Sequence, residues 1–401
     1  MTRMARSIGA IALVFATTLT VGVATQPAWA VDYPSWEDVQ AAKTSEAAKK
    51  AEIAKIEALI NGLETEAANA AKAALEAAEI CNQALDALEA AEKAADAVGE
   101  RADEATATAD ESSTRAASLL AQLARTTRSD LTLQLLFSDA GSADDLLYRI
   151  GAMNKLSATA SELYERAAFD RNLAESLSEQ AGAARDARAR LAEEAETALA
   201  EAQKASDEAA LRAERQEEIA AQLYAQLASL TGTSAATQRA YLEGVAWEKA
   251  QEAIKNPPPP PPLINPPPPP PSTGAVSGAI AFAQAQVGDP YLLNGSGPDA
   301  WDCSGLTKAS YASVGVYIGT HSATNQFATM QSAGRLVPFN DVVAGDLLFY
   351  ASGGSTSATK YHVTLYIGNG RMIEAPYPGR NVRVAPVRYG DLVPYAGRPT
   401  P

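Results

Sequence analysis

Apolar residues between Trp36 and about Arg125 recur at alternating steps of three and four, with Glu and Lys around them. This spacing is the heptad seam of an α-helical coiled coil. A second stretch of the same kind runs from about Ala152 to Leu230. Alanine fits many registers, so the isoleucines and leucines of the seam carry most of the argument. The seam positions are Ile53, Ile56, Ile60, Leu63, Ala67, Ala70, Ala74, Ala77, Cys81, Ala84, Leu88, Ala91, Ala95 and Val98.

The pattern breaks between Thr126 and Ile150, where the leucine-rich run Leu131–Phe137 precedes a polar turn. We therefore expect an antiparallel hairpin of two helices over residues 31–250, with an apolar tip near 126–150. Each arm would reach on the order of 120 Å at 1.5 Å per residue, with kinks at Gly62 and Gly99. The tip either contacts a partner or packs back onto the second arm.

The pattern changes again from Gly274 onward, where short helical and alternating segments predict an α+β domain over residues 274–401. A turn at Gly368-Asn369-Gly370 separates two of the expected strands. The expected helices are Ala275–Val287 and Asp302 to about Val314. The expected strands are Asp346–Tyr350, Tyr361–Ile367, Arg371–Ala375 and Val382–Val387.

Two further segments have a distinctive composition. Residues 1–30 combine a basic start, an apolar run from Ile8 to Val23 and the small-x-small site Ala28-Trp29-Ala30. This is the pattern of a cleaved secretory signal peptide, since the apolar run is short for a membrane anchor, the alternative. Residues 251–273 hold 12 of the 23 prolines. They predict an extended polyproline spacer of roughly 45 Å, the alternative being a docking ligand for a proline-binding domain.

Charge and cysteine content exclude several classes of protein. The net charge is -15, yet residues 274–401 hold eight Lys/Arg and seven Asp/Glu, so the acidic excess lies upstream. An acidic chain is a poor nucleic-acid binder. The chain has two Cys and two His, and one structural zinc site would use all four. Two thiols form at most one disulfide, which excludes a small fold stabilised by several disulfides. We expect no metal and no cofactor.

Cys303 begins a predicted helix, where free N–H groups and the helix dipole are expected to lower a thiol pKa. A nucleophilic thiolate needs a proton-accepting partner, and His321 and His362 are the two histidines of the chain. His362 lies on a predicted strand, which presents its side chain rigidly. The alternative is that Cys303 and His362 are two unrelated structural residues. Cys81, on the seam, is expected to be a small buried residue without redox or ligand chemistry.

Glu374 could orient His362 if the turn between their strands has three residues. Ile367 would then face Arg371, and Glu374 would lie diagonally across from His362 on the same face. A two-residue turn would move Glu374 to the other face.

Four motifs occur in the order typical of one family: Pro290-Tyr291, Asp302-Cys303-Ser304-Gly305-Leu306, Gly345–Phe349 and His362–Gly368. The segment from about Ala275 to Pro394 resembles the NlpC family of bacterial cell-wall cysteine peptidases. The resemblance implies a papain-like fold, in which a helix bearing the Cys packs on an antiparallel sheet that supplies the His.

The resemblance also assigns roles. It implies Cys303 as nucleophile, His362 as base and Glu374 as the residue that orients the imidazole. It implies Tyr291, Asp302, Ser304 and His321 as substrate-binding residues, with a surface or structural role as the alternative for His321. After the Tyr the family usually has an aromatic residue and glycines, whereas this chain has Leu292-Leu293-Asn294-Gly295. The structure of the substrate subsite at this point is therefore left open.

The whole architecture resembles secreted actinobacterial endopeptidases of the Rip type. The resemblance implies cleavage of peptidoglycan stem peptides at the D-glutamyl–meso-diaminopimelate bond, in the cell wall, during daughter-cell separation. It further implies a hairpin that restrains or localises the enzyme and docks through its tip on an FtsEX-type membrane complex. The alternatives are a non-catalytic wall or septum adaptor that acts through the hairpin, and an amidase on the same fold.

Overall fold

The computed structural model describes residues 33–128, 143–255 and 273–400. The expected signal peptide, the leucine-rich tip Leu131–Phe137 and the two proline runs of the linker lie outside the described residues. Within those residues, no helix is both long and apolar enough to span a membrane.

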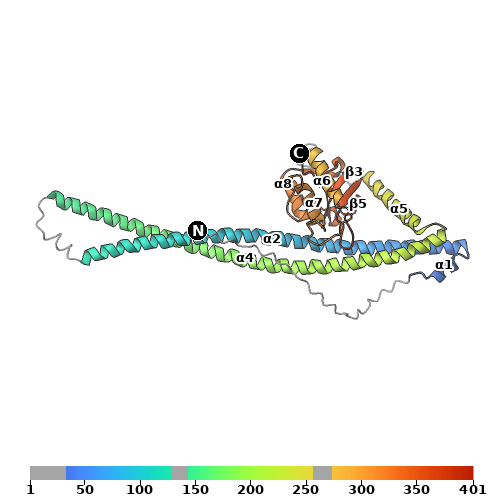
Figure 1. Ribbon diagram of the computed structural model, residues 1–401, viewed down its shortest axis with the longest axis horizontal. Helices are drawn as coiled ribbons and strands as arrows, with labels where there is room; N and C mark the ends of the chain where they lie inside the picture. The colour runs from blue at the N-terminus through green and yellow to red at the C-terminus, as the bar shows by residue number, and fades with distance from the viewer. Residues whose placement is uncertain (1–32, 129–142, 256–272, 401) are drawn as a thin grey trace, which may run out of the picture.

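Two long helices form the predicted hairpin. Helix α2 (Glu46–Arg128) and helix α4 (Ala143–Thr231) pack side by side, and Figure 1 shows them running as one long rod. Helix α2 is continuous through Gly62 and Gly99, so the expected kinks do not interrupt it. A short helix, α1 (Trp36–Ala42), precedes α2 and begins with a capping box between Ser35 and Asp38. The Trp36–Arg125 stretch is therefore two helices.

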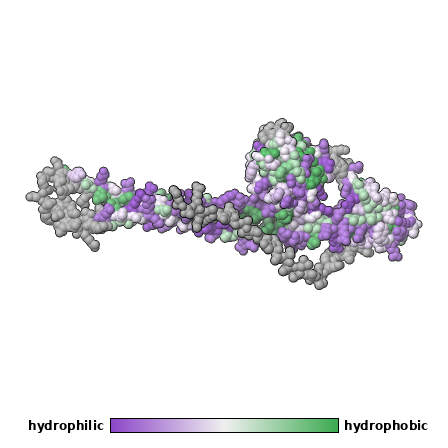
Figure 2. All heavy atoms as spheres, in the orientation of Figure 1, coloured by the Kyte–Doolittle hydropathy of each residue, from purple (hydrophilic) through white to green (hydrophobic). Residues whose placement is uncertain are grey.

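The hairpin core changes character along its length. Near α1 it contains large residues, with Ile56 and Ile60 of α2 packed against Leu223 and Leu227 of α4. Farther toward the tip the buried residues are almost all alanine, which lets two helices approach closely. The outer surface of the rod is mostly hydrophilic (Figure 2). Helix α5 (Ala235–Lys255) follows α4 after a turn at Gly232, whose φ is 73°.

The C-terminal domain is a six-stranded antiparallel sheet with three helices, α6 (Thr273–Ala285), α7 (Cys303–Ala312) and α8 (Ala323–Ser332). The strand order is β1-β6-β2-β3-β4-β5. The strands are β1 (Leu336–Pro338), β2 (Leu347–Ala351), β3 (Lys360–Gly368), β4 (Arg371–Glu374), β5 (Arg383–Pro386) and β6 (Leu392–Gly397). The helix α8 and the strands β1 and β6 were not among the expected elements.

This domain has its own hydrophobic core. The buried cluster is drawn from positions 279–396, and Leu75 of α2 is its one member from the hairpin. A core of this kind needs little from the hairpin, so the 274–401 segment has what an independently folding domain requires. The predicted multidomain fold, a helical hairpin followed by an α+β domain, is confirmed.

The domain sits against the hairpin. Helix α2 contacts β3 and α8, and Figure 1 shows the domain beside the rod, well away from its tip. The contact face includes the strand that carries His362.

Candidate active site

Cys303 is the first residue of α7. The Asp302 side chain caps the helix by accepting a hydrogen bond from the Gly305 N–H at 2.7 Å. Only glycine fits at position 305, because a Cβ there would lie 2.1 Å from the Gly295 carbonyl oxygen. The cap and this close approach fix the start of α7, and with it the position of the thiol.

The thiol faces β3. Its sulfur accepts from the backbone N–H of Val363, the residue after His362, and both this contact and the Ser304 N–H lower the pKa of Cys303. Burial outweighs them, and the negative charges of Asp302 and Glu79 add to it, so the pKa lies well above its ordinary value. The expectation of a lowered pKa is therefore wrong for this conformation. Cys303 is buried as a residue, at 6% exposed, and a helix N-terminus cannot offset that burial beside two carboxylates.

His362 and Glu374 form a buried pair, each 0% exposed. Nε2 of His362 lies 2.9 Å from Oε2 of Glu374, and because a carboxylate can only accept, Nε2 carries the proton. Nδ1 has no partner among the described residues. Burial lowers the pKa of His362 despite Glu374, which keeps the imidazole neutral. A neutral imidazole with a bare Nδ1 is suited to accept a proton.

A bulge explains how Glu374 reaches His362. The turn has two residues, Asn369 and Gly370, because Gly368 and not Ile367 faces Arg371. The register then shifts between Tyr366 and Gly368, so Leu365 faces Ile373. The two-residue turn alone would have moved Glu374 to the other face, and the bulge returns it to the face of His362.

Two arginines reach Glu374 from β5 and from the chain after it. Arg388 donates from Nη1 to Oε1 at 2.7 Å and from Nη2 to Oε2 at 2.8 Å, and Arg383 donates from Nε to Oε1 at 3.1 Å. Burial alone would raise the pKa of Glu374. Arg388 and the His362 hydrogen bond outweigh it and hold the pKa well below its ordinary value.

The four expected substrate-binding residues lie at or near the start of α7. Nε2 of His321 lies 2.8 Å from both carboxylate oxygens of Asp302, and Ser304 Oγ donates to Asp302 at 3.1 Å. Tyr291 is buried, and its pKa is raised first by burial and then by Cys303 and Asp302. The structure thus brings all four together near Cys303, while their part in binding substrate stays a prediction.

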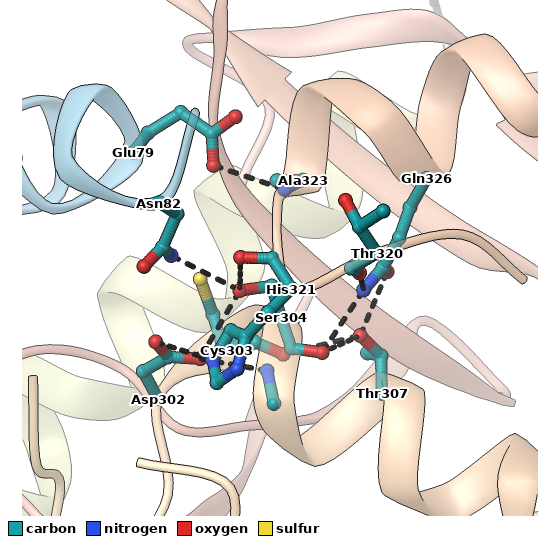
Figure 3. A network of polar contacts seen from close by, with 11 residues as sticks. Glu79, Asn82, Asp302, Cys303, Ser304, Thr307, Thr320, His321, Ala323 and Gln326 are labelled. Atoms are coloured by element: carbon teal, nitrogen blue, oxygen red, sulfur yellow. Dashed lines mark hydrogen bonds and ion pairs between the residues drawn. The ribbon is translucent and has the colours of Figure 1, made fainter. Parts of the chain in front are cut away.

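Helix α2 covers this site (Figure 3). The Glu79 carboxylate accepts from Ser322 Oγ at 2.6 Å and from the N–H groups of Ala323 and Thr324 at 2.9 and 3.0 Å, at the start of α8. Asn82 Nδ2 donates to Ser304 Oγ at 3.4 Å, next to Cys303. We call the Glu79 and Asn82 contacts the clamp.

Other polar contacts extend the interface beyond the clamp. These contacts join hairpin side chains to the C-terminal domain: Lys72–Asp391 at 2.7 Å, Ser352–Glu76 at 2.9 Å, Gln83–Thr324 at 3.1 Å, Thr320–Asp86, and Arg380 to Gln216 and Glu217 at 2.8 and 3.1 Å. Three of the hairpin partners, Glu76, Asp86 and Glu217, are acidic, which fits the acidic excess of the upstream region.

The clamp and the two arginines were not predicted from the sequence. Glu79 and Asn82 lie on a helix whose pattern predicts the hairpin seam, and nothing local indicates a second partner. Arg383 lies within the predicted strand Val382–Val387 and Arg388 directly follows it, and nothing in that pattern indicates a contact with Glu374.

Among residues 33–128, 143–255 and 273–400, no group of three or more His, Cys, Asp or Glu side chains could hold a metal ion. Cys81 and Cys303 are both free thiols. Cys81 packs among alanines of the hairpin and against Leu293 of the C-terminal domain.

A helix that starts with a buried Cys, packed on an antiparallel sheet that supplies a His–Glu pair, defines a papain-like cysteine hydrolase fold. The sequence profile of the NlpC/P60 family matches residues 288–393. The peptidoglycan endopeptidase RipB of Mycobacterium tuberculosis is 35% identical over 190 residues, which cover 43% of this chain and 75% of RipB. The chain belongs to the NlpC/P60 family, as its motifs predicted.

Two longer relatives match a smaller part. The peptidoglycan endopeptidase RipA of Mycobacterium tuberculosis is 38% identical over 127 residues, covering 28% of this chain and 25% of RipA. RipA of Mycolicibacterium smegmatis is 34% identical over 137 residues, covering 31% of this chain and 26% of that protein. The match therefore spans about a quarter of the length of these two relatives.

Proposed function

We propose that the protein is an exported cysteine endopeptidase that hydrolyses peptidoglycan stem peptides in the cell wall. The observation that carries this proposal is the neutral His362, held by Glu374 at Nε2 and bare at Nδ1, on the strand that packs against α7 and whose Val363 N–H contacts the Cys303 sulfur. The names of the relatives RipA and RipB support the substrate. The bond proposed is D-glutamyl–meso-diaminopimelate, and the process is daughter-cell separation.

The chemistry follows from the three residues. Nδ1 of His362 takes the proton of the Cys303 thiol, and the thiolate attacks the carbonyl carbon of the stem peptide. N–H groups at the start of α7 face the charge that develops on the carbonyl oxygen. The imidazolium returns its proton to the leaving amine, and water then hydrolyses the thioester. Glu374 accepts the Nε2–H throughout, which holds the ring in one orientation and stabilises the imidazolium.

We further propose that the hairpin restrains this activity. In the clamped conformation α2 lies over the site, and the charge of Glu79 joins burial in raising the pKa of Cys303. Both effects disfavour the thiolate that the reaction needs. Because the hairpin and the domain share one chain, even weak contacts act at a high effective concentration.

Release would come from a partner that binds the open conformation preferentially. The candidate is an FtsEX-type membrane complex that contacts the tip. Near the tip, on α4, Leu147, Tyr148 and Tyr164 are all exposed, which supports an apolar contact there. Export would place the enzyme outside the cytoplasm, where such a complex and the wall are both within reach.

Mass analysis of the fragments released from purified wall by the 274–401 segment tests the reaction. Peptide fragments cut after D-glutamate are expected, and Cys303→Ser should release none. Intact stem peptides freed from the glycan would favour the amidase. If no fragments appear, while the segment is folded and binds wall, the adaptor would be favoured.

A further inference from the structure

The carboxylate that orients His362 is itself held at both oxygens. Oε2 of Glu374 receives the His362 Nε2–H at 2.9 Å and Nη2 of Arg388 at 2.8 Å. Oε1 receives Nη1 of Arg388 at 2.7 Å and Nε of Arg383 at 3.1 Å. All four donors converge on a side chain that is fully buried.

Arg388 is fixed in turn by the residue opposite His362. Its guanidinium lies 5.2 Å from the centre of the Tyr350 ring, at a distance suited to a cation–π contact. Tyr350 of β2 faces His362 of β3 in the sheet, with the two ring centroids 5.6 Å apart. Arg388, Tyr350, His362 and Glu374 therefore form a closed ring of contacts.

The two arginines differ in which oxygens of Glu374 they contact. The planar guanidinium of Arg388 donates to both carboxylate oxygens of Glu374. It therefore restricts rotation of the carboxylate and stabilises its negative charge. Arg383 makes its contact with Oε1, the oxygen that His362 does not use. Rotation of the carboxylate by a few tens of degrees would take Oε2 out of line with Nε2, and Arg388 opposes that rotation.

We propose that Arg388 is a positioning residue, which aligns Glu374 so that the His362 ring keeps its proton on Nε2 and leaves Nδ1 without a proton. Its effect on turnover rests on the proposed function. Its effect on the tautomer does not, because the tautomer can be observed without substrate.

The chain has two histidines, which makes a direct observation practical. In full-length protein labelled with ¹⁵N-histidine, two-bond ¹H–¹⁵N spectra at pH 7 should show His362 as a single Nε2–H tautomer. Arg388→Gln should shift both ring nitrogens of His362 toward the averaged values of mixed tautomers. Arg388→Lys keeps the charge without the fork and should give an intermediate spectrum, and it serves as the test if Arg388→Gln does not fold.

Two controls make the result specific. Arg371→Gln removes an equal charge from an exposed position on β4, the strand of Glu374, and should leave the His362 signals unchanged. The His321 signals should stay unchanged in all variants, because that ring pairs with Asp302. Wild-type His362 signals in both folded Arg388 variants would overturn the proposal.

Kinetics provide the second readout. In the 274–401 segment, Arg388→Gln should lower kcat roughly 10- to 100-fold while KM changes less than about twofold, as expected for loss of a supporting contact. A rise in KM with kcat unchanged would also overturn the positioning role. If the wild-type segment cleaves no wall, the proposed function fails, and the spectra still decide the role of Arg388.

Discussion

At the scale of single residues, burial acts on all three members of the candidate triad and favours their neutral forms. It raises the pKa of Cys303 and lowers that of His362. For Glu374 alone the burial is outweighed, since Arg388 and His362 keep its pKa well below the ordinary value. The clamped site therefore holds a neutral thiol, a neutral imidazole and one carboxylate.

Replacing each cysteine in turn tests which one is the nucleophile and which one only packs in the hairpin. Cys303→Ser should abolish wall hydrolysis, because a serine hydroxyl does not ionise near neutral pH. Cys81→Ser should leave the chemical step intact, because Cys81 packs in the hairpin among alanines. Fragment release from wall, followed by chromatography, measures both. An active Cys303→Ser protein would rule out the assigned nucleophile.

Glu374→Ala should lower kcat at least 100-fold with little change in KM, since the residue acts on His362 and not on substrate. Glu374→Gln should be milder, because an amide oxygen can still accept the Nε2–H. It will not match wild type, because its NH₂ group would face Arg388 or Arg383. Steady-state kinetics on soluble muropeptides measure both variants, and full activity of Glu374→Ala would mean that another group holds the ring.

The lowered pKa of His362 fixes the sign of a pH effect on stability. The folded protein keeps this ring neutral below its ordinary pKa of 6.5, whereas the unfolded chain protonates it. Stability is therefore lost as the pH falls below about 6.5. His362→Gln should flatten this part of the profile. Thermal unfolding of the 274–401 segment between pH 7.5 and 5 measures it, and identical slopes for both proteins would contradict the assigned protonation state.

At the scale of elements, alternation along β3 was enough to predict the strand that presents His362. It was not enough to fix the β3–β4 register, because Asn369-Gly370 and the bulge before it act together. Strand β1 was missed because it has three residues, and β6 because Pro394 and Gly397 interrupt its pattern. Helix α8 was missed, although it is as long as α7, because most of its residues are polar. Arg388 was missed because its role depends on a chain segment beyond β5 folding back over Glu374.

Gly305→Ala tests the packing at the start of α7. The added methyl group would meet the Gly295 carbonyl oxygen, which cannot move aside easily because it accepts the Asp302 N–H at 2.9 Å. The variant should lose about 1–3 kcal/mol of unfolding free energy. Gly390→Ala, where a Cβ has no neighbour within 4 Å, is the matched control. Equal chemical denaturation midpoints would show that α7 tolerates the shift.

At the scale of the whole molecule, a long hairpin covers the site of a small domain that has its own core. Heptad spacing predicted the hairpin, and the motifs predicted the domain. The sequence could not predict which turn of α2 meets the site, because that contact joins residues more than 200 positions apart. Glu79 is central to it, as a buried carboxylate at the start of α8.

Glu79→Lys should open the clamp, because it replaces an acceptor of several hydrogen bonds with a cation facing the N–H groups of Ala323 and Thr324. Full-length Glu79→Lys should therefore hydrolyse wall faster than wild type, by roughly tenfold or more if the clamp contributes about 1.4 kcal/mol. Glu100→Lys, the same change at an exposed site on α2, is the control and should match wild type.

The most direct test compares the rates at which full-length protein, full-length Glu79→Lys and the 274–401 segment release fragments from purified wall. The rates should be measured over a range of salt, because partly exposed pairs such as Lys72–Asp391 are screened by ions. Restraint by the hairpin predicts the lowest rate for full-length wild type, a higher rate for Glu79→Lys and the highest for the segment. Equal rates at every salt concentration would contradict restraint by the hairpin.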